Sequence, residues 1–389
     1  MGENKTRELS YMLAVPEDPT DVANGVLHLA RLKNAKDFTV DGLEEKAGEL
    51  QLTIGYLGKE YTVRMIPTEF KIPELYRIQH FFSDADVDKL KKAKEGLGVI
   101  MEFGDDPLES YHLQLKIIHA ALPKKLAVFD DSAEKVLSGK WVELAAASAI
   151  APAPRYLYTA QAVSDEAGTV WLHSHGLNRC GLSELEVLAS DQENYQSHYG
   201  IMEVMANRML ELGEPLEEGE PLYLAQLSED VHLVTTHIHW NHAVKYFDET
   251  LLGGQCDREE GHNGNTGVIF AYPTQEAFEQ GQLSSIRVYD ALLKDNPLYL
   301  VSAKESDRMK ALAQARLNYV EKAYEDPTNK ILLKLELKGE TLWFELMQIL
   351  PEAGDEGEEL LVQDLNTGSM GEYAWDQVTD WLIYTSERR

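Results

Sequence analysis

Residues 99–129, VIMEFGDDPLESYHLQLKIIHAALPKKLAVF, decide the fold class of the chain. The stretch opens with a predicted strand at 99–103, and Pro107 then begins a predicted helix. The apolar side chains of this helix recur at helical spacing: Leu108, Tyr111, Leu115 and Ile118. A second strand is predicted at 126–129. The order strand, helix, strand predicts a packed α+β layer.

The same pattern extends over the first 150 residues. A strand is predicted at 11–15, and the runs 51–54 and 61–66 predict a hairpin around Gly58. Ser83 begins a predicted helix that stops at Gly96. We therefore expect an N-terminal α+β domain over residues 1–150.

Two proline-containing stretches mark predicted domain boundaries. In the segment 151–154, APAP, two prolines fix φ and remove backbone donors, and Asp326-Pro327 marks a second break. These breaks predict a middle α+β domain over 155–326, which ends in a long helix at 303–324, and a β-rich C-terminal module over 328–389. The expected fold class is α+β and multidomain, with mixed sheets and flanking helices.

The composition is that of an ordinary globular protein, except for its charge. The 389 residues are 44% hydrophobic and 26% charged, but 66 acidic residues outnumber 36 basic ones, for a formal net charge of −30. A polyanion without a run of Lys or Arg repels phosphate backbones, so we expect no nucleic-acid partner. The charge fits either solubility alone or an acidic face that meets a basic protein.

Cysteine content and hydropathy predict a cytoplasmic protein. The only cysteines are Cys180 and Cys256, so no disulfide framework is expected. We see neither a signal peptide nor an apolar run of the ~18 residues that a membrane span needs. A reducing compartment and no membrane partner are therefore expected.

Histidines gather in the middle domain. Eight of the 12 lie between positions 173 and 262: His173, His175, His198, His232, His237, His239, His242 and His262. On strands, His173 and His175 share one face, as do His237 and His239, because side chains alternate with period two. If both strands belong to one sheet and the faces meet, these imidazoles could bind one zinc ion. The alternative is that they hydrogen-bond within a polar sheet face or meet solvent.

The segment 234–242, VTTHIHWNH, resembles the His-x-His-x-Asp-His signature of the metallo-β-lactamase fold family. The resemblance implies His237, His239 and His242 as metal ligands. Asn241 stands where the signature has an acidic ligand, and the upstream order of strands and helices does not resemble that fold. Zinc at these residues stays open, and no other cofactor is expected.

Cys180 is the candidate nucleophile. Ser183 and Glu186 have the spacing of a capping box, which predicts a helix from Glu184 with its positive end near the thiol. Arg179 adds a cation, and both features lower a thiol pKa. His173 or His175 could then act as the base. The alternative is a small buried side chain of moderate reactivity in a glycine-flanked turn.

Aromatic side chains are dense in the C-terminal module: Trp343, Tyr373, Trp375, Trp381 and Tyr384. Such density is typical of a core, but Trp and Tyr also supply large contact areas in binding surfaces. Trp343, Trp375 and Trp381, together with Arg179, are therefore candidate binding-surface residues.

Three stretches carry a resemblance to a known family: 171–181 (WLHSHGLNRCG), 342–345 (LWFE) and 378–385 (VTDWLIYT). Together they resemble uncharacterised bacterial proteins of the domain of unknown function 4026, and the tail is similar to the domain of unknown function 2314. The resemblance implies a bacterial cytosolic protein and supplies no activity.

These observations favour a non-enzymatic binding protein, with neutralisation of a basic protein partner as one role for it. The alternative is a metal- or thiol-dependent hydrolase that uses residues 173–180 and 237–242. Such an enzyme is expected to carry zinc or a hyper-reactive Cys180.

Overall fold

The computed structural model describes residues 7–46, 48–72, 76–78, 80–256, 258, 265–294, 302–337, 339–350 and 359–385. The chain divides into two compact units: unit 1 comprises Met1–Ala147 and Ala151–Leu300, and unit 2 comprises Ser148–Ile150 and Val301–Arg389. Within the described ranges, no helix has both the length and the apolar character needed to cross a membrane.

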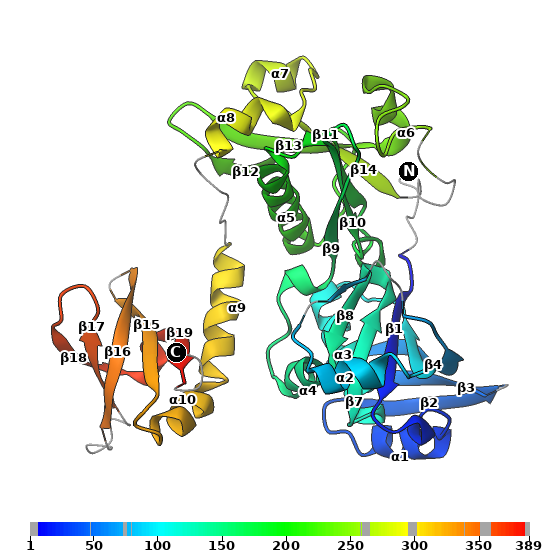
Figure 1. Cartoon of the computed structure of the whole chain (residues 1–389), viewed down its shortest axis with the longest axis vertical. Coiled ribbons are helices and arrows are strands. Elements are labelled where there is room, and N and C mark those ends of the chain that lie inside the picture. Colours follow the sequence, from blue (N-terminus) through cyan, green and yellow to red (C-terminus); the bar gives the residue numbers. More distant parts are fainter. Residues whose placement is uncertain are drawn as a thin grey trace. The chain divides into compact units, whose positions relative to one another are not determined.

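The first half of unit 1 forms an eight-stranded sheet in the order β2-β3-β4-β6-β1-β7-β8-β5 (Figure 1). Helices α1, α3 and α4 cover the face of β1 that carries Met12 and Ala14, and α2 covers the face that carries Leu13 and Val15. The elements are β1 (Ser10–Pro16), α1 (Gly25–Lys33), β2 (Thr39–Lys46), β3 (Glu49–Tyr56), β4 (Lys59–Glu69), β5 (Arg77–Ile78), α2 (Asp84–Leu90), β6 (Glu95–Met101), α3 (Pro107–Ala121), β7 (Lys125–Asp130), β8 (Lys135–Ser138) and α4 (Gly139–Ala147).

The stretch 99–129 folds in the predicted order, as part of β6, then α3 and β7. Asp106 caps α3, because its carboxylate accepts a hydrogen bond from the Glu109 N–H at 3.0 Å, and Pro107 occupies the start of the helix. The predicted hairpin is β3 and β4, which turn at Leu57 and Gly58 with φ of 47° and 77°. The α+β fold class is confirmed.

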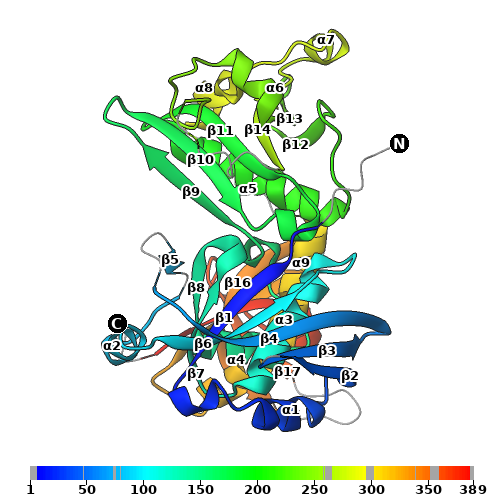
Figure 2. The same ribbon diagram turned by 90° about the vertical axis from the view of Figure 1, so that its right-hand side faces the viewer.

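The second half of unit 1 forms a six-stranded sheet in the order β12-β13-β14-β11-β10-β9 (Figures 1 and 2). β11 and β14 are parallel, and the other pairs are antiparallel. α5 packs on one face, where Met205 and Met209 are buried in the core. The elements are β9 (Thr159–Ser164), β10 (Thr169–His175), β11 (Glu184–Asp191), α5 (Tyr195–Leu212), β12 (Leu222–Gln226), β13 (His232–His239), α6 (Trp240–Ala243), β14 (Thr266–Ala271), α7 (Gln275–Glu279) and α8 (Asp290–Leu293).

One hydrophobic core runs through both halves of unit 1. It includes Met12 of β1 as well as Leu172 of β10 and Met205 of α5. The stretch 151–154, which the sequence marks as a boundary, lies between the two sheets of this unit. A second, smaller core on the other face of the six-stranded sheet contains Trp171 and Trp240.

Unit 2 is a five-stranded antiparallel sheet in the order β18-β17-β16-β15-β19 with helices on one face. The segment 303–324 was expected as one long helix of the middle domain, but it forms two helices of unit 2. Val320 packs against the buried leucines of β15, and the Trp381 indole donates to the Ala313 carbonyl at 3.1 Å. The elements are α9 (Ala303–Gln314), α10 (Leu317–Tyr324), β15 (Lys330–Leu337), β16 (Glu340–Leu350), β17 (Glu359–Asp364), β18 (Met370–Ala374) and β19 (Val378–Tyr384).

The prediction of a helix that begins at Glu184 is wrong, because Glu184–Asp191 form the strand β11. Leu185 and Val187 are buried in the core under α5, whereas Glu186 bonds to Trp171 on the opposite face. The Ser183 hydroxyl donates to Asn265 Oδ1 at 2.8 Å instead of capping a helix. Burial of alternate side chains on the two faces of the sheet therefore favours a strand more than the spacing of Ser183 and Glu186 favours a helix.

Candidate functional site

The two His-x-His strands lie in one sheet, as predicted, but their imidazoles lie on opposite faces. β14 and β11 separate β13 from β10. The register places His173 beside Glu186, Glu186 beside Val268, and Val268 beside Ile238. Paired residues on neighbouring strands share a face, so Ile238 lies on the face of His173, and His237 lies on the other. The expectation that both pairs could bind one metal ion is therefore wrong.

On the first face, the histidines of β10 have aromatic and acidic neighbours. The ring centres of Trp171 and His173 are 4.2 Å apart, and those of His173 and His175 are 4.9 Å apart. His175 Nδ1 lies 3.6 Å from a carboxylate oxygen of Glu134, whose other oxygen accepts a hydrogen bond from Gln161 at 2.7 Å. Glu134 lies between β7 and β8, so these contacts tie the end of β10 to the first sheet.

A buried ion pair occupies the centre of the same face. The side chains of Arg258 and Glu186 are in contact and are only 1% and 2% exposed. The guanidinium lies 4.9 Å from the ring centre of Trp171 and 4.6 Å from that of Trp240. Burial raises the pKa of Glu186 to about 7, against the opposing effect of Arg258. Because both side chains are enclosed, this pair fastens Arg258 to the sheet.

Cys180 does not have the surroundings of a thiolate. It lies in a buried 3-10 turn, η4 (Asn178–Cys180), and its Sγ donates to the Gly176 carbonyl at 3.7 Å. Burial raises the pKa of the thiol to about 12, and Arg179 offsets only part of this effect. The helix that was expected to assist ionisation is a strand. Of the two features predicted to lower the pKa, the helix end is therefore absent, and Arg179 is outweighed by burial.

Arg179 stabilises the interior and is not on a binding surface. Its side chain and that of Asp130 are both 0% exposed. Its two terminal nitrogens donate to the two Asp130 oxygens at 2.7 and 3.0 Å. They also donate to the Ser10 hydroxyl at 3.1 Å and to the Leu157 carbonyl at 2.6 Å. Because Asp130 ends β7 and Arg179 follows β10, the pair joins the two sheets of unit 1.

A buried Ser–His–Asp chain is a cluster that the sequence patterns missed. The Ser190 hydroxyl lies 2.7 Å from His198 Nδ1, and His198 Nε2 lies 2.8 Å from Asp290 Oδ1. Ser190 is 2% exposed and His198 is 0% exposed, so a substrate could not reach the hydroxyl. This series of hydrogen bonds instead links β11, α5 and α8. No local motif announces it, because Asp290 is 92 positions from His198.

A further cluster lies where β13 leads into α6. It consists of Glu218, His239 and His242, and we call it the Glu218 cluster. The Glu218 carboxylate accepts a hydrogen bond from the His239 backbone N–H at 3.0 Å, and its two oxygens lie 2.7 and 2.9 Å from His242 Nδ1. The ring centres of His239 and His242 are 6.3 Å apart. Burial raises the pKa of Glu218, but the hydrogen bonds from His242 and His239 outweigh it and hold the pKa below its usual range.

The cluster is open to solvent, with side-chain exposures of 58% for His242 and 29% for Glu218. In the part of the chain that the structure describes, no three His, Cys, Asp or Glu side chains are already arranged to hold a metal ion. His262, which the sequence groups with the other histidines, lies outside the described residues.

The three candidate tryptophans of unit 2 lie on different faces of its sheet. Trp375 and Trp381 pack against the core on the helix side. Trp343 pairs with Lys334 on the helix-free face, because the neighbouring pair, Leu333 and Phe344, points into the core. Around Trp343 lies a hollow of about 440 Å³ lined by Leu332, Thr341, Leu342, Trp343, Leu365, Asn366 and Leu382.

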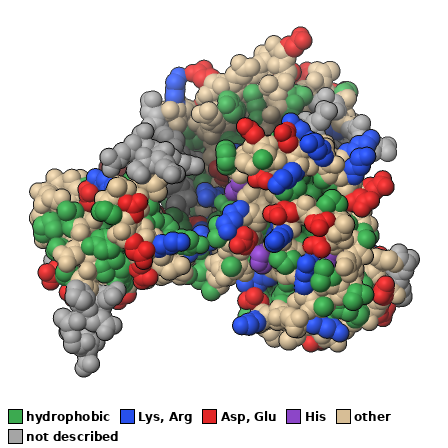
Figure 3. All heavy atoms as spheres, turned by 60° about the horizontal axis from the view of Figure 1, so that its bottom comes forward, with side chains coloured by type: hydrophobic (Ala, Val, Ile, Leu, Met, Phe, Trp, Pro, Cys, Tyr) green, Lys and Arg blue, Asp and Glu red, His purple; other side chains and the backbone are tan. Residues whose placement is uncertain are grey.

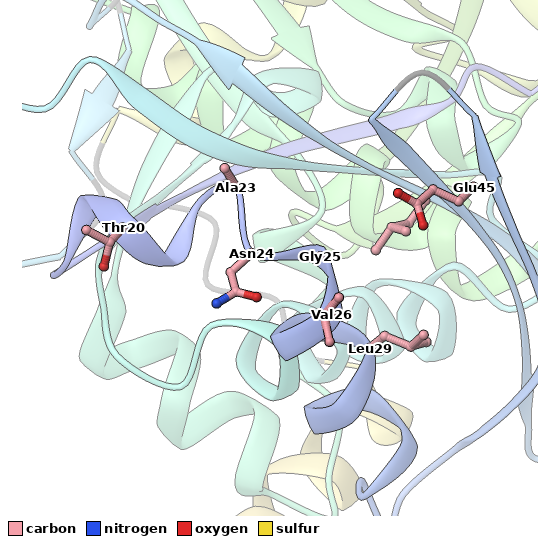
Figure 4. A pocket seen from close by; sticks show the side chains of 8 residues that line it. Thr20, Ala23, Asn24, Gly25, Val26, Leu29 and Glu45 are labelled. Atoms are coloured by element: carbon pink, nitrogen blue, oxygen red, sulfur yellow. The ribbon is translucent and has the colours of Figure 1, made fainter.

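Another hollow, of about 420 Å³, lies in unit 1 between the start of α1 and the β2–β3 hairpin (Figure 4). Asn24 caps the helix by accepting a hydrogen bond from the Leu27 N–H at 3.1 Å, and Val26 is 83% exposed. Of the residues that line this hollow, only Glu45 is charged. The hollow therefore offers little for the recognition of a charged ligand.

Figure 3 shows one face of the molecule coloured by side-chain type. On unit 1, Lys and Arg side chains lie interspersed with Asp and Glu side chains, and the described residues of this view form no continuous basic band. On unit 2, hydrophobic side chains gather and Asp and Glu side chains border them.

Two joined sheets with flanking helices and buried polar clusters, followed by a small helix-backed sheet, define an α+β protein. Residues 10–152 match the family model described as protein of unknown function (DUF4026) N-terminal, and residues 160–270 match its C-terminal counterpart. The chain belongs to this family, as the resemblance predicted. No similar curated protein and no similar solved structure was found.

Proposed function

We propose that the protein is a non-enzymatic binding protein and that the helix-free face of the unit 2 sheet contacts a basic protein partner. The hollow around Trp343 carries this proposal. An aromatic side chain in an apolar hollow is typical of the energetic centre of a protein interface.

The wall of this hollow contains apolar side chains that meet water in the isolated chain. Leu332 and Leu382 are partners on neighbouring strands, and Leu382 and Leu365 are 44% and 45% exposed. Covering such side chains with a partner removes apolar surface from water, which favours association.

The charges near this face favour a basic partner. Glu345 and Asp380 share the helix-free face, by their pairing with Leu332 and Lys334, and Glu345 also forms an ion pair with Lys330 at 2.7 Å. The Lys334 ammonium lies 6.0 Å from the Trp343 ring centre, so the ring already accepts a cation on one side. With a formal charge of −30, the chain attracts cationic proteins and repels nucleic acids.

The alternative, a metal- or thiol-dependent hydrolase, has less support. The thiol branch needs a thiolate, but burial raises the pKa of Cys180 to about 12. The form of the metal branch that joins the histidines of both strands at one site fails, because the register places His173 and His237 on opposite faces of the sheet.

Binding of basic peptides tests the proposal. The untagged full chain is titrated into fluorescent 12-residue peptides that carry either Lys and Arg or Glu, and anisotropy is recorded at low and physiological salt. We expect Trp343→Ala to weaken binding of the basic peptides at least about tenfold. Tyr319→Ala is the matched control, because Tyr319 is an exposed aromatic residue on the helix side of the same unit. Equal binding by Trp343→Ala and the unaltered chain, or equal binding of acidic peptides, contradicts the proposal.

Two further points belong to this proposal. We infer that the C-terminal module is related to the domain of unknown function 2314, because Trp343 and the Asp380-Trp381 pair stand as in the resemblance. We also infer a bacterial cytosolic setting, for which the low cysteine content is the physical support.

A further inference from the structure

We propose that Glu218, His239 and His242 form a binding site for one zinc ion where β13 leads into α6. This inference is independent of the binding role proposed for unit 2. It rests on the contacts within the Glu218 cluster and on the chemistry of its three side chains.

The ligand chemistry of the cluster suits zinc. Imidazole nitrogen and carboxylate oxygen are both common zinc ligands, and three protein ligands leave one position for water. Glu218 already contacts His242 through both carboxylate oxygens, at 2.7 and 2.9 Å. The loop that carries Glu218 is rich in further carboxyl groups, which attract a cation: Glu214, Glu217 and Glu220.

Only small movements convert the present geometry into a zinc site. With zinc bonds of ~2.0–2.1 Å in a tetrahedral arrangement, two ligand atoms lie roughly 3.3 Å apart. The observed separation of 2.7 Å between Glu218 Oε1 and His242 Nδ1 is a hydrogen bond that zinc would replace, with an opening of about 0.6 Å. Two imidazoles on one zinc ion have ring centres roughly 5 Å apart, so His239 must approach His242 by about 1 Å from 6.3 Å.

The carboxylate of the proposed site comes from outside the segment that carries the histidines. Glu218 lies in the loop before β12 and contacts His242 at 2.7 Å. His237 is not part of the proposed site, because its side chain is 1% exposed and packs against Gly267. A Cβ at Gly267 would lie 2.5 Å from His237 Cδ2.

The test is zinc binding by the full chain without a histidine tag. Zinc is titrated in competition with a chromophoric chelator, and cobalt absorption spectra report the coordination. We expect one zinc ion per chain with a dissociation constant in the micromolar range or tighter, and weaker binding as the pH falls and the imidazoles protonate. His242→Ala, His239→Ala and Glu218→Gln should each weaken binding at least about tenfold, since even loss of an outer partner often costs that much.

The control is His232→Ala, which removes an exposed histidine at the other end of β13. It should change zinc affinity less than twofold. Glu218→Gln keeps an acceptor for the His239 N–H, and His242 is mostly exposed, so both variants should fold. The proposal is overturned if the chain binds no zinc below about 100 μM, a range typical of adventitious surface sites. It is also overturned if any of the three variants binds zinc as the unaltered chain does, or if His232→Ala lowers affinity equally.

Discussion

Removing one member of the buried Asp130–Arg179 pair should greatly destabilise unit 1. Arg179→Met keeps a long apolar stem but removes the donors to Asp130, Ser10 and Leu157. The Asp130 carboxylate, 0% exposed, is then left without its cation. Breaking a buried pair in this way costs about 3–5 kcal/mol, which is a large share of the ~5–15 kcal/mol by which domains are stable.

Two further variants separate the loss of the pair from the loss of an arginine. Arg287→Met breaks an ion pair with Asp191 whose side chains are 46% and 28% exposed, so its cost should stay below about 1 kcal/mol. The double variant Arg179→Met with Asp130→Leu removes both charges of the pair. It should therefore be more stable than Arg179→Met alone.

Urea unfolding measures these differences. Circular dichroism and tryptophan fluorescence follow the transition of unit 1, and a linear extrapolation gives the free energy of unfolding in water. Unit 2 should unfold as in the unaltered chain, because none of these residues belongs to it. A loss below about 1 kcal/mol for Arg179→Met, or a double variant as unstable as the sum of its single variants, would refute the reasoning.

Three other expectations concern single side chains. Cys256 is exposed and Cys180 is buried, with the pKa of its thiol raised to about 12, so a thiol reagent at neutral pH should modify Cys256 and reach Cys180 only on unfolding; equal rates for the two thiols would contradict this. Burial lowers the pKa of His198 below 6.5, so the folded state favours neutral imidazole, and the stability it contributes is complete above the unfolded-state pKa and lost as the pH falls through the folded value. Thermal unfolding should therefore show a smaller loss between about pH 7 and pH 5 for His198→Gln than for the unaltered chain, and parallel losses would argue against it. Gly267→Ala would place a Cβ 2.5 Å from His237 Cδ2, so urea unfolding should show a destabilisation of about 1–3 kcal/mol, and an unchanged midpoint would mean that the ring can move aside.

The sequence was most informative where neighbours along the chain decide the structure. The helix α3 follows from the spacing of Tyr111, Leu115 and Ile118 and from Pro107 at its start, and all of these signals lie within one stretch. The β3–β4 hairpin likewise follows from Gly58, whose positive φ the turn requires.

Local signals failed where the sheet decided the outcome. Ser183 and Glu186 have helix-capping spacing, but Leu185 and Val187 gain burial on one face only as a strand. The relation between the two His-x-His strands depends on β14 and β11 lying between them, and the sequence does not reveal that strand order. The alternation of side chains along a strand correctly predicted that the two histidines of each pair share a face. It could not predict that the two pairs lie on opposite faces of the sheet.

The contacts at the candidate sites join residues that no window of sequence brings together. Glu218 meets His242 at a separation of 24 positions, and Asp290 meets His198 at 92. Arg179 could be recognised from the sequence as a cation near Cys180. Its burial depends on Asp130, 49 positions away.

The ion pair between Asp130 and Arg179 has a consequence for recombination between this chain and a relative. Asp130 lies in the region matched by the N-terminal family model, and Arg179 lies in the region matched by the C-terminal one. A recombination event between residues 152 and 160 that brings in a partner region from a relative would be tolerated only if the newcomer supplies the matching charge and the matching core side chains. The two regions should therefore be inherited together as one segment of a gene, and a chain that carries either region alone should be prone to aggregation and proteolysis, because a charge and the core around it would be exposed.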